Sequence, residues 1–265
     1  MDSPKNARVV AARALHSARG RRSARAFLAE GPHAVAAAVA ASFPVREVFV
    51  TAEAAERDKP LLRALAGGGT QVNEVTDRAL RAVAETVTPQ GIVGVVTIPA
   101  DTPLPDRPRL VAVLERCADP GNAGAVIRTA DAVGADAVVL GQGSVDVWSG
   151  KCVRSSAGSV FHIPLVTALD AADCVEQLRT RGCQVFATAA DGECSLDDLS
   201  TDGRLAAPTA WVFGSESHGL GTQVAAGVDA VVRIPIEGRA ESFNLAAAAA
   251  ICLYSSASVQ RLNQG

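Results

Sequence analysis

Residues 110–128 read LVAVLERCADPGNAGAVIR, an apolar run followed by a Pro-Gly turn and then by a helical pattern. The run Leu110–Leu114 contains no polar residue, which is typical of a parallel strand buried on both faces. Asn122 stands where a helix cap is needed, so we expect a helix over Ala123–Val133. A strand, a tight turn and a helix in this order predict one unit of a parallel α/β sheet.

The same alternation continues toward the C-terminus. Apolar runs predict further strands at Ala137–Leu140, Val185–Ala189, Thr209–Phe213 and Ala230–Ile234. Helical patterns occupy Ala171–Arg181, Gln223–Ala226 and Phe243–Leu262. We therefore expect a C-terminal α/β domain with a central parallel sheet covered by helices.

A second, smaller α/β unit precedes this domain. It begins with a basic helix within residues 4–25, which ends in an arginine-rich turn at residues 20–23. Its other expected elements are strands at 26–30, 45–51, 71–75 and 92–98, and helices at 32–41, 59–66 and 77–85. Residues 99–108 contain four prolines, which make a stiff linker. The predicted domains are residues 1–100 and 109–265, joined by a linker at 101–108.

The composition describes a globular chain with an uneven distribution of charge. Of the 265 residues, 48% are hydrophobic, which is enough for a sizeable core and excludes a disordered chain. The formal net charge is −3, yet residues 1–30 hold seven basic and two acidic residues. This basic N-terminal arm suggests a polyanionic partner, although a solvated helix face explains the same charges equally well.

We expect neither a membrane segment nor a metal site. The sequence has no charge-free apolar run of about 18 residues and no basic-then-apolar leader, so we expect a cytoplasmic protein. The six cysteines are far apart without a C-x-x-C pair, and the four histidines lack metal-ligand spacing. The cysteines are expected to be reduced, buried side chains.

Polar segments follow several predicted strands, and ligands bind at this edge of a parallel sheet. Residues 115–129 offer a helix N-terminus and Arg128 to a phosphate, although an ordinary turn with a surface arginine is the simpler explanation of this segment alone. Residues 141–143 read Gly-Gln-Gly and hint at a dinucleotide site, but Asp146 stands where the third glycine belongs.

Two later segments have the same position. Residues 214–221 place a serine beside a histidine, but Glu216 occupies the nucleophile position of a hydrolase elbow, so the hydrolase pattern fails. The glycines of this segment would let a ligand approach the backbone closely. In residues 235–244, we expect Ser242 to cap the long final helix and Asn244 to lie in its first turn.

Three motifs occur in a fixed order, Asn122-x-Gly124-x-x-x-Arg128, Gly214-x-Glu216-x-x-Gly219, and Ile234-Pro235-Ile236 with Ser242-x-Asn244. Together they resemble the motifs of the SpoU (TrmH-like) RNA 2′-O-ribose methyltransferases of the SPOUT superfamily. The resemblance covers residues 108–262, with Phe243 where leucine is usual. Residues 27–32 resemble the opening of the ribosomal-protein-L30e-like RNA-binding domain that many members carry.

The resemblance implies a fold, a cofactor and a reaction. The C-terminal domain would be an α/β fold whose last segment forms a deep trefoil knot, an exception to the rule against knots. S-adenosylmethionine would bind in the knot and give its methyl group to a ribose 2′-oxygen. Matching positions assign the cofactor to Gly214, Ile234, Ile236, Phe243 and Leu245. Matching positions assign catalysis to Arg128, Asn122, Glu216, Ser242 and Asn244.

Arg128 matches an arginine that the family uses as a base or to orient the reacting ribose and phosphate. An arginine guanidinium holds its proton strongly, so deprotonation is costly and we favour the orienting role. Family members are usually homodimers, and the alanine-rich final helix is suited to tight packing between two copies.

The expected partner is RNA, and the L30e-like unit favours 23S ribosomal RNA over transfer RNA. The expected RNA contacts are Arg19, Arg21, Arg22, Arg25, Lys151 and Arg154. Two other hypotheses remain at this point. One is a non-catalytic RNA-binding or assembly protein that kept the fold, and the other is a nucleotide-dependent dehydrogenase that uses residues 141–143.

Overall fold

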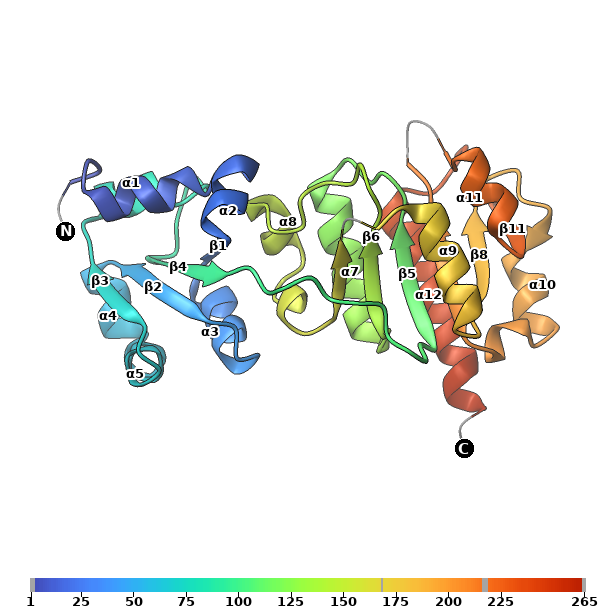
Figure 1. The fold of residues 1–265 in the computed structure, drawn as a ribbon, viewed down its shortest axis with the longest axis horizontal. Coiled ribbons are helices and arrows are strands. Elements are labelled where there is room, and N and C mark those ends of the chain that lie inside the picture. The colour runs from blue at the N-terminus through green and yellow to red at the C-terminus, as the bar shows by residue number, and fades with distance from the viewer. Residues whose placement is uncertain (1–2, 168, 216–218, 264–265) are drawn as a thin grey trace. The chain divides into compact units, whose positions relative to one another are not determined.

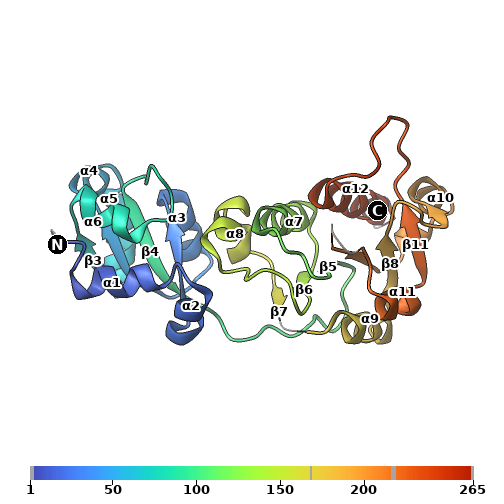
Figure 2. The same cartoon turned by 90° about the horizontal axis from the view of Figure 1, so that it is seen from above.

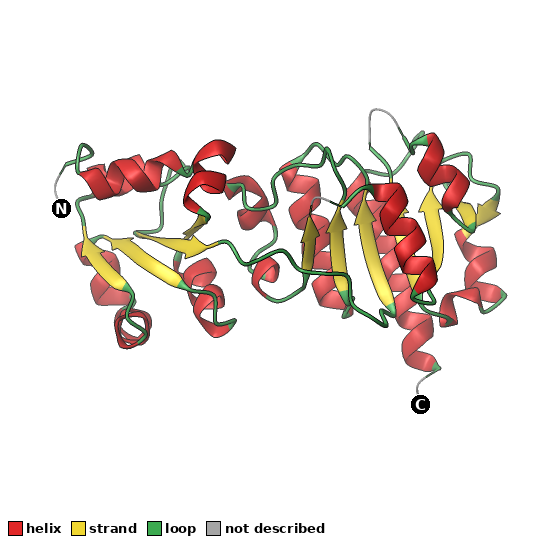
Figure 3. Cartoon of the chain, viewed as in Figure 1, coloured by secondary structure: helices red, strands yellow, loops and turns green. Residues whose placement is uncertain are grey.

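The computed structural model describes residues 3–167, 169–215 and 219–263. The chain forms two compact units, each with its own sheet (Figures 1 and 3). The first unit contains Met1–Ala100 and Asp146–His162, and the second contains Asp101–Val145 and Ile163–Gly265. The expected mixed α/β class is confirmed, with a parallel sheet in the second unit.

The first unit is built on a four-stranded sheet with the order β1-β4-β2-β3. Strand β4 (Ile92–Thr97) pairs antiparallel with both β1 (Ala26–Glu30) and β2 (Val45–Val50). Strand β3 (Gln71–Glu74) pairs parallel with β2. All four strands were expected from the sequence, with ends that differ by one residue or less.

The helices of this unit include two short ones at its N-terminus, α1 (Ala7–Ala14) and α2 (Ala18–Ala24). The others are α3 (Pro32–Ala40), α4 (Ala52–Arg57), α5 (Lys59–Gly67), α6 (Asp77–Val83), α8 (Gly150–Ser155) and the 3-10 helix η1 (Ser159–Phe161). The expected arginine-rich turn is instead the interior of α2, because Ser17 caps a new helix by accepting a hydrogen bond from the backbone of Gly20.

The N-terminal residues are a packed part of this unit. Val9, Ala12 and Leu15 are buried in one hydrophobic cluster with Ala79 and Leu80 of α6. The segment therefore packs on the unit and is not a free arm.

Residues 146–162 pack against the first unit, although the sequence placed them in the C-terminal domain. The ring of Phe27 lies 4.7 Å from that of Trp148 and 6.0 Å from that of Phe161, measured between centroids. Aromatic contacts of this kind are specific in geometry and bury large areas. The sequence pattern carries no local signal for such a return of the chain.

The second unit has a seven-stranded sheet with the order β7-β6-β5-β10-β8-β11-β9, and every pairing in it is parallel. Its strands are β5 (Leu110–Leu114), β6 (Ala137–Leu140), β7 (Leu165–Thr167), β8 (Gln184–Thr188), β9 (Cys194–Ser195), β10 (Thr209–Phe213) and β11 (Ala230–Arg233). The two shortest strands, β7 and β9, were not predicted. They are edge strands of two or three residues, too short to show a pattern.

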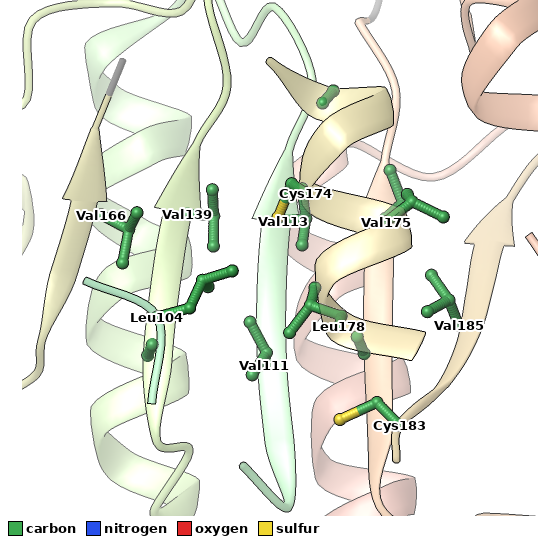
Figure 4. Packing of buried hydrophobic residues seen from close by; sticks show 14 of the residues in the cluster. Leu104, Val111, Val113, Val139, Val166, Cys174, Val175, Leu178, Cys183 and Val185 are labelled. Carbon is green, nitrogen blue, oxygen red and sulfur yellow. The ribbon is translucent and has the colours of Figure 1, made fainter. Parts of the chain in front are cut away.

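Helices cover both faces of this sheet, as Figure 2 shows. They are α7 (Pro120–Val133), α9 (Ala171–Thr180), α10 (Leu196–Thr201), η2 (Arg204–Ala206), α11 (Thr222–Gly227) and α12 (Leu245–Leu262). Helices α7 and α12 lie on one face, and α9 and α11 lie on the other. Under α9, the valines of β5, β6 and β8 pack with Cys174 and Leu178 to form the core (Figure 4).

Helix α12 is the one described helix that is long and apolar enough to cross a membrane by length and composition. Its contacts in the structure are those of a core helix. The indole N–H of Trp211 in β10 donates a hydrogen bond of 2.8 Å to the hydroxyl of Ser256, and both residues are fully buried. The trefoil knot stays a prediction.

Candidate active site

A cavity of about 520 Å³ lies at the carboxyl ends of β8, β10 and β11. This is the edge at which open parallel sheets bind their ligands, and the volume is typical of a small-molecule site. The five residues that the resemblance assigned to a cofactor all line this cavity, namely Gly214, Ile234, Ile236, Phe243 and Leu245. Ser242 and Asn244, which were assigned to catalysis, line it too.

Sequence reasoning missed a second wall of the cavity. Thr188, Ala189, Ala190 and Asp191 line it from the end of β8. A signal for them existed, because they are the last two residues of the predicted strand Val185–Ala189 and the two that follow it, and so lie at the carboxyl edge of the parallel sheet.

Position 214 has no room for a side chain. A Cβ at this position would lie 2.7 Å from the carbonyl carbon of Gly219, closer than real contacts allow. The backbones of Ser215 and Gly219 exchange two hydrogen bonds, of 3.1 and 2.8 Å. Gly214 and Gly219 therefore bring main-chain groups, rather than side chains, to the wall of the cavity.

Asn244 and Asn122 meet beside the cavity. The amide nitrogen of Asn244 donates a hydrogen bond of 3.1 Å to the side-chain oxygen of Asn122.

The expected capping roles were wrong for both segments. Asn244, not Ser242, caps α12 by accepting hydrogen bonds from the backbones of Ala246 and Ala247. Ser242 lies in the preceding loop and is exposed.

Asn122 is likewise not the cap of its helix. Asp119 caps α7, and its carboxylate accepts a hydrogen bond of 2.9 Å from the backbone of Asn122. Proline occupies the first helical position, which is common because this position needs no N–H. The two motif asparagines lie within hydrogen-bonding distance of each other, while their capping roles depend on where each helix begins.

Arg128 does not line the cofactor cavity. It is exposed on α7 and borders a shallower cavity of about 480 Å³ between α7 and α12. Tyr254 and Ile251 of α12 line the same hollow, and the side chain of Tyr254 is 60% exposed. Arg128 therefore lies on an apolar helical face of this unit.

Glu216 lies outside the described residues. Another acid, Glu115, is buried at the end of β5 and was not considered from the sequence. One of its carboxylate oxygens accepts a hydrogen bond of 3.1 Å from the backbone of Gly221. This bond ties the loop after β10 to the neighbouring strand.

The six expected RNA contacts have very different environments. Arg19, Arg22, Arg25, Lys151 and Arg154 are exposed. Arg21 is buried, with its guanidinium 2.7 Å from the carboxylate of Asp146 and hydrogen-bonded to the backbone oxygens of Leu15 and His16. The assignment of Arg21 to RNA is therefore not supported, because all sides of its guanidinium are used within the unit.

Arg154 forms part of a charged cluster in the first unit. Its guanidinium contacts the carboxylates of Glu30 and Glu85 at 3.1 and 3.2 Å. Glu30 also accepts hydrogen bonds from the backbones of Glu85 and Thr86, so it fixes this loop. Arg154, with His33 and other residues, borders a cavity of about 510 Å³.

Two buried thiols of the second unit favour the protonated form. Burial raises the pKa of the Cys174 thiol to about 12 and that of Cys183 to about 11, because a thiolate is poorly solvated in an apolar interior. Across the described ranges, no group of three or more histidine, cysteine and acidic side chains is arranged to hold a metal ion.

The sequence matches two protein-family descriptions. Residues 109–254 match the SpoU rRNA methylase family, and residues 6–94 match an MRM3-like substrate-binding domain. The chain is 34% identical over 254 residues to the 23S rRNA (guanosine(2553)-2′-O)-methyltransferase RlmP of Bacillus subtilis, covering 96% of this chain and 97% of the relative. It is 33% identical to a 23S rRNA (uridine(2479)-2′-O)-methyltransferase of Streptomyces viridochromogenes, covering 94% of this chain and 89% of the relative.

Solved structures share the fold over the full length. An AdoMet-bound rRNA methyltransferase from Sinorhizobium meliloti superposes with a TM-score of 0.85 at 32% identity, covering 97% of this chain and 96% of the other. The SpoU methyltransferase AviRb from Streptomyces viridochromogenes, in complex with AdoMet, has a TM-score of 0.84 at 31% identity, covering 98% of this chain and all of the other.

Proposed function

The chain belongs to the SpoU rRNA methylase family, and from this premise we propose that it methylates the 2′-oxygen of a ribose in 23S ribosomal RNA, with S-adenosylmethionine as the donor. The observation that carries the proposal is the cavity at the carboxyl edge of the parallel sheet. Its wall holds every residue that motif matching assigned to the cofactor. The fold alone would not carry the proposal, because one fold hosts many functions.

The cavity fits the donor in size and in chemistry. Aliphatic side chains such as Ile234, Ile236 and Leu245 would cover the adenine, while the backbone around Gly214 would supply hydrogen bonds. Asp191 would add a carboxylate on the opposite wall. When bound, S-adenosylmethionine supplies an electrophilic methyl group on a sulfonium.

The residues of the chain then orient the nucleophile. A ribose 2′-hydroxyl is a poor nucleophile and must give up its proton, finally to solvent, when it takes the methyl group that the bound donor would supply. Asn244 lines the cavity and its amide bonds Asn122, so this pair would lie beside the incoming ribose and orient it. Arg128 would hold the adjacent phosphate with its planar fork of N–H donors, and Glu216 and Ser242 complete the proposed set.

The first unit would hold the RNA. The exposed Arg19, Arg22, Arg25 and Lys151 supply cations for phosphates, and Arg154 borders a hollow in the same unit. We retain the proposed division into a substrate-binding part and a catalytic part joined at residues 101–108. Residues 146–162 join the former by their packing.

A homodimer is part of the proposal. The exposed Tyr254 and the aliphatic residues around it form an apolar face on α7 and α12, and such a face favours a second copy of the chain. Light scattering on the purified chain tests this, with Tyr254→Glu expected to shift the mass toward a monomer. We also place the enzyme in the cytoplasm, where ribosomal RNA would be available.

The deciding experiment maps 2′-O-methyl sites on unmodified 23S rRNA with and without the purified chain. A new site that depends on S-adenosylmethionine supports the proposal, and transfer RNA in a parallel reaction tests the alternative substrate. Calorimetry with S-adenosylmethionine tests the non-catalytic alternative. No binding at millimolar cofactor would favour an RNA-binding protein that kept the fold.

A further inference from the structure

Arg116 has a backbone conformation that is unusual for its residue type. It directly follows β5 and has a φ of +52°, in the left-handed region that glycine and asparagine adopt more readily. Non-glycine residues held in this region occur most often at functional sites, where the surrounding structure imposes the conformation.

The neighbouring backbone imposes it here. The N–H of Glu115 donates to the carbonyl of Phe213 at 2.9 Å, and the N–H of Cys117 donates to the hydroxyl of Ser144 at 3.1 Å. Since the residues on both sides are fixed, the chain must turn at position 116. Glycine would satisfy this turn at lower cost, so the arginine needs another explanation.

The side chain of Arg116 is held in place on one side and open on the other. Its guanidinium lies 3.3 Å from the carboxylate of Glu115, whose side chain is 4% exposed, while the side chain of Arg116 is 57% exposed. The other carboxylate oxygen of Glu115 binds the backbone of Gly221. A buried acid therefore orients the guanidinium and leaves most of its N–H donors facing solvent.

Two glycines make room for this side chain. A Cβ at Gly221 would lie 3.0 Å from the Nη2 atom of Arg116, and a Cβ at Gly143 would lie 3.3 Å from its Cγ. The arginine thus lies close to Gly143, after β6, and to Gly221, after β10. Its position is set in advance, which lowers the entropy lost when a ligand binds.

This position is next to the proposed active site. Strands β5 and β10 are neighbours in the sheet, with Leu114 paired to Phe213, and the cofactor cavity begins at Phe213 and Gly214. An RNA strand that presents its ribose to this cavity must pass along the same edge of the sheet. A phosphate on that strand matches the planar N–H fork of an arginine.

We propose that Arg116 is a positioning residue that binds a backbone phosphate of the RNA near the target ribose. The proposal rests on the proposed function, since it concerns the substrate of the same site. Because Glu115 neutralises much of the charge, Arg116 acts through directed hydrogen bonds at short range rather than through long-range attraction.

The test uses Arg116→Gly in the full-length chain, because glycine relieves the backbone strain while it removes the guanidinium. We expect a melting temperature close to that of the wild type, because the relief of backbone strain offsets the loss of the ion pair with Glu115, and an S-adenosylmethionine affinity within twofold. We expect the KM for 23S rRNA to rise about tenfold, as for the loss of a charged hydrogen bond. Arg116→Lys should recover part of this loss, because lysine lacks the fork but keeps the charge.

Ser42→Gly is the matched control. Ser42 is exposed with a φ of +60°, so glycine relieves similar strain away from the sheet edge. It should raise stability and leave the KM for RNA unchanged. An unchanged KM in Arg116→Gly, with the wild type active, would overturn the role of Arg116 alone, whereas an inactive wild type would overturn the proposed function.

Discussion

The amide nitrogen of Asn244 lies 3.1 Å from the side-chain oxygen of Asn122, so one hydrogen bond joins the N-termini of α7 and α12 beside the cofactor cavity. The same Asn244 side chain caps α12 through its oxygen. One residue therefore stabilises a helix with one atom and orients a candidate catalytic amide with the other.

The two roles of Asn244 can be separated. Asn244→Ala removes both, so we expect unfolding to be easier by about 1 kcal/mol and methyl transfer to fall roughly ten- to a hundredfold. Asn244→Ser keeps a good cap but is too short to reach Asn122, so stability should stay near that of the wild type while activity stays low. Thermal unfolding and initial rates measure the two effects. Full activity in the serine variant would show that the link to Asn122 is not used.

Removal of Arg128 should abolish methyl transfer and keep the fold and the cofactor site. Arg128 is exposed on α7 and does not line the cofactor cavity, so Arg128→Ala should change the affinity for S-adenosylmethionine by only several-fold. Arg128→Lys should not restore the rate, because lysine cannot provide a planar fork. Arg204→Ala, which removes another exposed arginine of the same unit, serves as the control in the same assay. An active Arg128→Ala enzyme would refute the motif assignment.

We expect Arg21 to contribute to the stability of the fold and the adjacent Arg22 to contribute to RNA binding. Arg21→Ala removes a buried guanidinium that bonds Asp146 and two backbone oxygens, so we expect a stability loss of about 1–3 kcal/mol. Arg22→Ala, at an exposed position, should leave the free energy of unfolding unchanged. It should reduce the slope of log affinity for RNA against log salt concentration by about one, because one counterion fewer is released on binding. Chemical denaturation and binding at several salt concentrations distinguish them. Equal stability of the two variants would contradict the buried role of Arg21.

Stability should fall at alkaline pH because of buried thiols. The pKa of Cys174 rises from 9.0 to about 12 in the folded chain, so between these values the unfolded state loses its thiol proton while the folded state keeps it. The unfolded state then binds fewer protons, and each such thiol lowers the free energy of unfolding by up to about 1.4 kcal/mol per pH unit. Cys174→Ala should make the decline above pH 9 less steep. An unchanged slope in urea titrations would exclude this thiol as a cause.

The sequence predicted the central part of the fold well and its irregular parts poorly. Strands β5, β6 and β10 have the predicted ends, because a continuous apolar run specifies a strand buried on both faces. Helix starts were less accurate. Asp119 and Asn122 are both good caps three residues apart, and the choice between them depends on the Pro-Gly pair that opens α7.

The sequence indicated the candidate site residues that belong to the three motifs. It did not indicate the residues whose environment depends on tertiary packing. The residues around Gly214 and Ile234 were located by their motif positions alone. The burial of Arg21 follows from its contact with Asp146, 125 residues away, and no local pattern encodes such a pair. No sequence pattern indicates Arg116, because its backbone conformation, rather than its residue type, distinguishes it.

The return of residues 146–162 to the first unit also limits how the protein can be divided. The polypeptide enters that unit twice, so a protease cut in the linker at 101–108 severs one of the connections and leaves the others. An expressed fragment that stops at Ala100 would lack Trp148 and Phe161 and would expose the ring of Phe27 to water. A swap of substrate-binding modules between relatives must therefore exchange two separate stretches of the gene.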